Sequence, residues 1–246
     1  MSKLRAPERG PKRVRVYLGG ELVADTTNVM LVWEIPYFPQ YYFPSADVAA
    51  ELVPTATRTH SPSRGDASHF TVKTANGTAV DAAWEYTDSR VEELRGLVRF
   101  DWDAMDGWFE EDEEVFTHPR SPYTRVDILD SSRRVQVIVE GITVAESSDP
   151  KLLFETDLPT RYYLHKVDVR MDLLVPSETE SHCPYKGVAR YWSVRAGDIL
   201  VPDVAWSYPT PLPESQKVAG LVAFYNEHVD HVIDGVVAAR PHTKFS

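Results

Sequence analysis

The chain repeats itself along most of its length, and this repeat constrains the fold more than any other feature. The segment that begins with RVRVYLGG at Arg13 aligns with RVQVIVEG at Arg134, and further matches follow in the same order. Solenoid repeats have units of roughly 20–50 residues, so a period this long indicates a duplicated domain instead. The matched pairs include Val14 and Val135, Val16 and Val137, Gly20 and Gly141, Tyr41 and Tyr162, Tyr42 and Tyr163, Trp84 and Trp206, and Tyr86 and Tyr208.

The repeat divides the chain into four segments. We expect an N-terminal arm over residues 1–12, a first repeat domain over 13–109, an acidic and aromatic connector over 110–133, and a second repeat domain over 134–246. Duplicated domains often approximate a two-fold pair, so we expect the copies to form a pseudo-dimer within a monomeric chain. The acidic run 110–114 has carboxylates for a metal, but such runs are usually solvated.

Each copy reads mostly as β-structure. Apolar residues alternate on both sides of Glu140-Gly141, which predicts a hairpin with a two-residue turn, and Gly19-Gly20 stands at the same place upstream. In the segment ARYWSV, Trp192 and Val194 fall on one strand face, which we expect to be core, while Tyr191 falls on the other. The predicted fold class is therefore mainly β, with two tandem homologous small domains.

Composition excludes several classes of partner. The chain has 246 residues, 43% of them hydrophobic, and a formal net charge of −11. Nucleic acids bind mainly through Lys and Arg, so this acidity argues against them. No apolar run approaches the roughly 18 residues of a membrane span. The single cysteine cannot form an intrachain disulfide or a four-cysteine zinc site, so we expect a cytoplasmic protein without metal or cofactor.

The hexapeptide HCPYKG, from His182 to Gly187, corresponds to HSPSRG in the first copy. Only the second copy has the thiol, Cys183, where the first has a serine. Both copies keep a cation, Lys186 or Arg64, and a cation close to a thiol favours the reactive thiolate. Three interpretations remain open for Cys183: a small buried hydrophobe, a thiol that lines a pocket, and a catalytic nucleophile.

Further candidates surround this motif. Glu155 matches Glu34 and ends an apolar strand, where a buried carboxylate needs a partner, and Arg161 is close enough in sequence to provide one. His228 and His231 could form a metal pair, but the sequence offers no third ligand. Ligand pockets are rich in aromatic residues, and the second copy has many. The predicted ligand-binding residues are Glu155, Arg161, Tyr163, Tyr185, Lys186, Tyr191, Trp206 and Tyr225, with Cys183 as the catalytic candidate.

The stretches VAESSDPKLLFETDLPTRYYLHKVDVRMDLL, CPYKGVARYWSV and VAGLVAFY resemble domain-of-unknown-function family 427, which also carries a nucleotidyltransferase-like label. The resemblance extends over both copies and is stronger in the second. It implies a small β-rich domain similar to the β-tent fold of B-type methionine sulfoxide reductases and of the thalidomide-binding domain of cereblon. Those relatives hold zinc with four cysteines, which this chain lacks. A glycine-rich phosphate cradle and a paired-carboxylate motif, which nucleotidyl transfer would require, are also missing from the sequence.

Three functions follow from these observations as hypotheses. The first is a small-molecule-binding protein with an aromatic pocket in the second domain near Cys183 and Lys186. The second is an enzyme that uses Cys183 as a nucleophile or redox thiol. The third is a structural or interaction module. We favour binding, because a nucleophilic cysteine needs a base held in place by a third group, and the sequence identifies no such pair.

Overall fold

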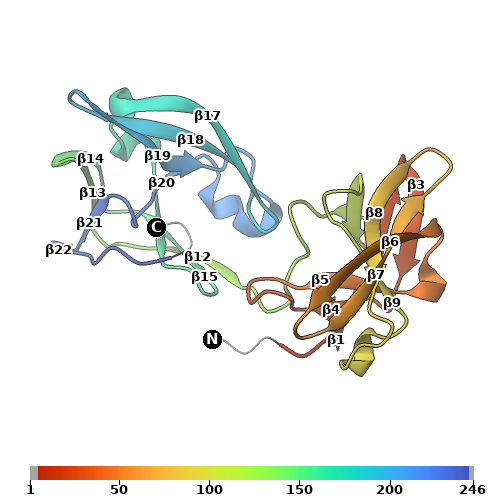
Figure 1. The fold of residues 1–246 in the computed structure, drawn as a ribbon. Coiled ribbons are helices and arrows are strands. Elements are labelled where there is room, and N and C mark those ends of the chain that lie inside the picture. Colours follow the sequence, from red (N-terminus) through yellow and green to blue (C-terminus); the bar gives the residue numbers. More distant parts are fainter. Residues whose placement is uncertain (1–4, 244–246) are drawn as a thin grey trace. The chain divides into compact units, whose positions relative to one another are not determined.

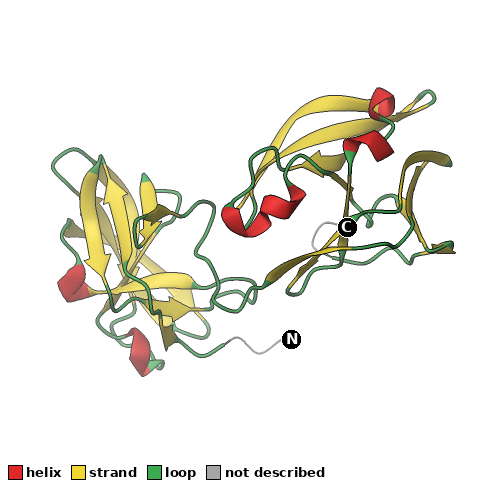
Figure 2. Cartoon of the chain, turned by 180° about the vertical axis from the view of Figure 1, so that it is seen from behind, coloured by secondary structure: helices red, strands yellow, loops and turns green. Residues whose placement is uncertain are grey.

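The computed structural model describes residues 5–243, and the chain divides between Ser121 and Pro122 into two compact units. Residues 1–4 of the predicted N-terminal arm lie outside the described residues. Strands predominate in both units and the helices are short (Figure 2). The structure thus confirms the predicted mainly β fold in two tandem halves. The short 3₁₀ helices are η1 (Ser45–Asp47), η2 (Glu92–Leu94), η3 (Lys166–Asp168), η4 (Met171–Leu173) and η5 (Pro213–Val218).

The first unit contains a seven-stranded and a four-stranded antiparallel sheet. The strands of the large sheet and strand β3 of the small sheet are labelled in Figure 1. The large sheet has the order β1 (Glu8–Arg9), β4 (Met30–Val32), β5 (Gln40–Pro44), β9 (Leu97–Phe100), β8 (Thr78–Glu85), β7 (Gly65–Lys73) and β6 (Glu51–Ser61). The small sheet has the order β11 (Glu113–Glu114), β10 (Gly107–Glu110), β2 (Val14–Leu18) and β3 (Glu21–Thr26).

The second unit repeats this arrangement strand for strand. Its large sheet has the order β12 (Val126–Asp130), β15 (Lys151–Glu155), β16 (Arg161–Leu164), β20 (Val222–Phe224), β19 (Ile199–Ser207), β18 (Gly187–Ala196) and β17 (Leu174–Cys183). Its small sheet has the order β14 (Ile142–Ser147), β13 (Val135–Val139), β21 (Asp230–Ile233) and β22 (Val236–Val237). The shared strand order shows that the sequence repeat is a repeat of fold.

The predicted two-residue turns are present in both units. Glu140 and Gly141 have φ angles of 47° and 78°, and Gly19 and Gly20 have 63° and 74°. Two successive positive φ angles define the mirror-image turn that suits the twist of a hairpin. Gly19 also has a packing role, because a Cβ there would lie 2.6 Å from the backbone of Asn76.

The main core of the second unit lies between its two sheets. It combines valines of the small sheet, such as Val135 and Val137, with residues of the large sheet, such as Val194. Trp192 packs against this core as predicted, whereas Tyr191 belongs to a separate cluster on the other face of the large sheet. The first unit likewise has a second apolar cluster on its large sheet. In each unit, therefore, the large sheet is apolar on both faces.

Some strands lie outside the predicted repeats. Strand β1, within the predicted arm, pairs with β4, and β12, within the predicted connector, pairs with β15. Strand β11 also falls in the predicted connector and closes the small sheet of the first unit. In the acidic run, Glu110 is buried and accepts a hydrogen bond of 2.5 Å from Tyr41, besides its ion pair with Lys12. Among the helices of the described part of the chain, none is long and apolar enough to cross a membrane.

Candidate functional site

The hexapeptide HCPYKG forms the tip of the hairpin between β17 and β18. Cys183 is the last residue of β17, and its carbonyl accepts a hydrogen bond of 3.2 Å from the backbone N–H of Lys186. Gly187 follows with φ +96°, the left-handed conformation that ends a three-residue hairpin loop. The first unit has the same turn, with a bond of 3.3 Å from Arg64 to Ser61. Both copies therefore keep the same backbone shape.

The cation of this turn reaches across the sheet. Lys186 is buried and forms an ion pair with Glu155 on β15. Three strands separate β15 from β18, which would place them about 19 Å apart in a flat sheet. The large sheet must therefore curve and carry the hairpin tip over its outer face, the face turned away from the small sheet. In the first unit, Arg64 pairs with Glu34 at 3.5 Å in the same way.

The expected ion pair between Glu155 and Arg161 was wrong, because Arg161 pairs with Glu227. The two terminal nitrogens of Arg161 donate to the two Glu227 oxygens at 2.5 and 2.7 Å, and Thr243 donates to the same carboxylate at 2.7 Å. The Glu227 side chain has no exposed surface. Burial opposes its ionisation, but the hydrogen bonds from Arg161 and Thr243 outweigh burial and lower the pKa of Glu227. The error arose because sequence proximity does not determine which strand ends meet.

Aromatic rings cover the centre of the outer face. The indole N–H of Trp206 donates to the Tyr163 hydroxyl at 3.2 Å. The centres of the Trp206 and Tyr225 rings are 4.4 Å apart. The hydroxyls of Tyr191 and Tyr225 are 3.2 Å apart, and Tyr191 is also 2.8 Å from the Ser181 hydroxyl. The guanidinium of Arg161 lies over two of these rings, 5.6 Å from the centre of the Trp206 ring and 5.5 Å from that of Tyr225. We call the five residues of this cluster the aromatic face: Tyr163, Tyr191, Trp206, Tyr208 and Tyr225.

Tyr208 differs from the other members of the aromatic face. Only 5% of it is exposed, and its hydroxyl has no hydrogen-bond partner among residues 5–243. Burial raises its pKa well above the ordinary value, and negative charge on Tyr163 or Cys183 raises it further. The hydroxyl is therefore neutral and protonated at physiological pH. Cys183 itself is half-buried.

The corresponding tyrosine of the first unit, Tyr86, has a hydrogen-bond partner within the protein. The Arg64 side chain donates to its hydroxyl at 3.4 Å and lies 5.6 Å from its ring centre while also pairing with Glu34. A guanidinium carries donors on three separate nitrogens and can serve both partners, whereas the three donors of Lys186 share one nitrogen, which is held against Glu155. The replacement of arginine by lysine thus leaves a polar hydroxyl available in the second unit.

The structure brings most of the predicted site residues together and separates others. The aromatic face contains Tyr163, Tyr191, Trp206 and Tyr225, with Arg161 beside it and the pair Lys186–Glu155 closing over the sheet. Tyr185 lies half-buried at the hairpin tip, where its carbonyl accepts a bond from Ser215. Sequence reasoning omitted Tyr208, Glu227 and Ser181 from the site. The first of these had a signal, because the repeat matches Tyr208 to Tyr86, whereas Glu227 and Ser181 had none.

The two histidines near the C-terminus do not form a metal site. His231 is buried, with its Nδ1 atom 3.3 Å from the Val229 carbonyl, whereas His228 is exposed. Burial lowers the pKa of His231 to about 4, so it is neutral at physiological pH. Within the described residues, no group of three or more His, Cys, Asp and Glu side chains is arranged to hold a metal ion.

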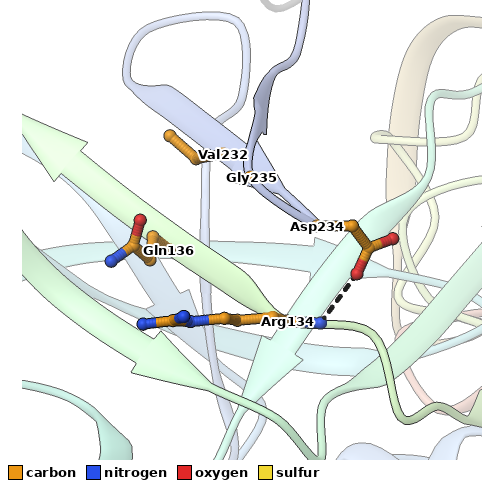
Figure 3. A pocket seen from close by; sticks show the side chains of 5 residues that line it. All are labelled: Arg134, Gln136, Val232, Asp234 and Gly235. Carbon is orange, nitrogen blue, oxygen red and sulfur yellow. Dashed lines mark hydrogen bonds between the residues drawn. The ribbon is translucent and has the colours of Figure 1, made fainter.

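A shallow pocket lies on the small sheet of the second unit (Figure 3). Its volume is about 320 Å³. Arg134 donates its backbone N–H to Asp234 at 3.0 Å and pairs through its side chain with Glu146, so its polar groups already have partners. None of the residues that line the pocket belongs to the aromatic face. The pocket is lined by Arg134, Gln136, Val232, Asp234 and Gly235.

Comparison with known proteins accounts for the two units. The model of a family described as a domain of unknown function, DUF427, matches the chain twice, over residues 6–111 and 127–235. The chain belongs to this family. It is a tandem DUF427 protein, and each match corresponds to one of the two units described above. A comparison with curated proteins found no match.

Proposed function

We propose that the second DUF427 domain binds a small molecule on its aromatic face, beneath the hairpin tip that carries Cys183 and Lys186. The observation that carries this proposal is the Tyr208 hydroxyl, which has no protein partner within residues 5–243 although only 5% of the residue is exposed. A typical hydrogen bond contributes about 0.5–1.5 kcal/mol net. A ligand that accepts a hydrogen bond from this hydroxyl would gain about this much on binding.

The contrast between the domains supports this proposal. Both keep the turn, the curved sheet and the ion pair across it, as the pairs Arg64–Glu34 and Lys186–Glu155 show. These shared features are what the fold requires. In the first domain Arg64 donates to Tyr86, whereas the second domain has a shorter cation and a thiol at the same place. The second domain therefore keeps polar groups for a ligand where the first uses them internally.

The same geometry favours binding over nucleophilic catalysis by Cys183. A cysteine nucleophile needs a base within hydrogen-bond reach. His182 precedes Cys183 in strand β17, so its side chain lies on the opposite face, and it is exposed. The other adjacent basic group, Lys186, is engaged by Glu155. Neither residue is placed to accept the thiol proton.

The single cysteine gives a direct test. Iodoacetamide should alkylate Cys183 in the native protein at a measurable rate, because this residue is half-buried. A library of ring-containing fragments is then screened for compounds that slow this alkylation, with the free amino acid cysteine as a control for direct reaction with the reagent. We expect protecting fragments, and we expect substitution of Trp206 by Leu to weaken their protection. If no fragment slows alkylation of the native protein, the binding proposal is wrong.

A further inference from the structure

The charges around the aromatic face cancel one another within the protein. The two buried cations of this region each have their own carboxylate, Lys186 with Glu155 and Arg161 with Glu227. The second pair uses both terminal nitrogens of the guanidinium. A charged ligand would have to compete with one of these pairs or bring an uncompensated charge into a buried environment. Either costs several kcal/mol, so the face disfavours ions of both signs.

The groups that remain for a ligand are neutral. They are the Tyr208 hydroxyl, for which residues 5–243 supply no partner, and the half-buried Cys183 thiol. A phenol hydroxyl donates one hydrogen bond and accepts others. Four of the five rings are covered by the protein, so the ring surface open to a ligand is that of half-buried Tyr225, and such surface packs best against flat apolar groups. The site is thus composed of one strong donor, one weak donor and the exposed part of one aromatic ring.

The rings also limit how a ligand can lie. The Tyr191 and Tyr225 rings are nearly parallel, at 15°, with centres 6.4 Å apart. A ring inserted between them would need about 3.5 Å on each side, which is more than this spacing provides. A ligand must therefore lie against the rings from one side, where half-buried Tyr225 retains exposed surface.

We infer that the ligand is an uncharged flat molecule with a hydrogen-bond acceptor of the carbonyl type, directed at the Tyr208 hydroxyl. This inference rests on the proposed function, which it makes specific. The acceptor takes the hydrogen bond of the Tyr208 hydroxyl, the flat body packs against the exposed part of Tyr225, and the absence of charge leaves both ion pairs intact. The first domain does not bind the same class, because the Arg64 guanidinium occupies the space at the Tyr86 hydroxyl and ring.

Three probes of the same shape and different charge test the inference. Benzamide is neutral, benzoate is an anion and benzamidinium is a cation at pH 7, and all three share one ring. Each is titrated into the full chain and followed by protein-observed NMR, with protection of Cys183 from iodoacetamide as a second measurement. We expect benzamide to bind at least about tenfold more tightly than either ion, which corresponds to about 1.4 kcal/mol.

The repeat supplies a matched pair of variants. Tyr208→Phe removes the hydroxyl offered to the ligand, whereas Tyr86→Phe removes the corresponding hydroxyl of the first domain. We expect Tyr208→Phe to weaken benzamide binding about fivefold, which corresponds to about 1 kcal/mol for one hydrogen bond. Tyr86→Phe should leave benzamide binding unchanged. Far-UV circular dichroism and the unfolding midpoint establish that both variants are folded.

The outcomes separate the ligand class from the binding function. If benzoate or benzamidinium binds as tightly as benzamide, the neutral class is wrong, although binding at the face stands. If Tyr208→Phe binds benzamide as well as the original chain does, the assigned acceptor contact is wrong. If none of the three probes binds while other fragments protect Cys183, the class is again overturned and the proposed function is retained.

Discussion

Replacing Arg161 by Met should destabilise the second unit far more than an ordinary substitution. The change removes two hydrogen bonds, of 2.5 and 2.7 Å, from a Glu227 side chain that has no exposed surface. Thr243 would remain as a donor to that carboxylate. Removing one partner of a buried ion pair typically costs about 3–5 kcal/mol, because a charge is left buried without compensation. Total domain stability is about 5–15 kcal/mol, so this is a large fraction.

The first unit offers a matched control in Arg99→Met. Arg99 pairs with Glu34 at 2.5 Å and lies 4.5 Å from the centre of the Trp84 ring, much as Arg161 lies over Trp206. Glu34, however, has a second partner, since Arg64 approaches it to 3.5 Å. Its charge stays compensated when Arg99 is lost. We therefore expect a smaller cost of about 1–2 kcal/mol, from one charged hydrogen bond and the ring contact.

Hydrogen exchange with mass spectrometry in increasing urea measures the unfolding midpoint of each unit separately, from the peptides that belong to that unit. We expect Arg161→Met to lower the unfolding midpoint of second-unit peptides by more than Arg99→Met lowers that of first-unit peptides. The double variant Arg161→Met with Glu227→Leu should recover most of the loss, because no buried charge remains. Equal effects of the two single variants, or a double variant less stable than Arg161→Met, would refute this reasoning.

Three further predictions concern other parts of the chain. Lys186→Arg should let the longer side chain donate to Tyr208, as Arg64 donates to Tyr86. The variant should slow alkylation of Cys183 by iodoacetamide without loss of stability. The folded-state pKa of His231 is about 4, below the ordinary 6.5, so the unfolded state binds more protons between these values. Stability is therefore fully present above about pH 6.5 and falls by about 3 kcal/mol towards pH 4, a slope that His231→Phe should remove in urea titrations at several pH values. Gly19→Ala should destabilise the first unit by about 2 kcal/mol or more in a thermal melt, because Gly19 has φ +63° and a Cβ there would lie 2.6 Å from the backbone of Asn76. Glu140→Ala, at the matching turn position, should be nearly neutral.

The sequence by itself determined the features that depend on neighbours along the chain. The duplication is visible as matched residues, and each turn is readable from two residues, such as Glu140 and Gly141, because a turn has few allowed conformations. Alternation along one strand likewise placed Tyr191 and Val194 on opposite faces. These properties are local, so the pattern of residues is sufficient to predict them.

Only the tertiary structure decided which charged and polar groups meet. Lys186 reaches Glu155 because the sheet curves across three intervening strands, and that curvature leaves no local mark in the sequence. The order of the strands likewise brings Glu227, which is distant along the chain, next to Arg161. The accessible hydroxyl of Tyr208 depends on the first of these facts, because Glu155 holds the Lys186 ammonium. Ion pairs and hydrogen bonds act over a few ångströms, so they follow the positions of strands in space, not the order of residues.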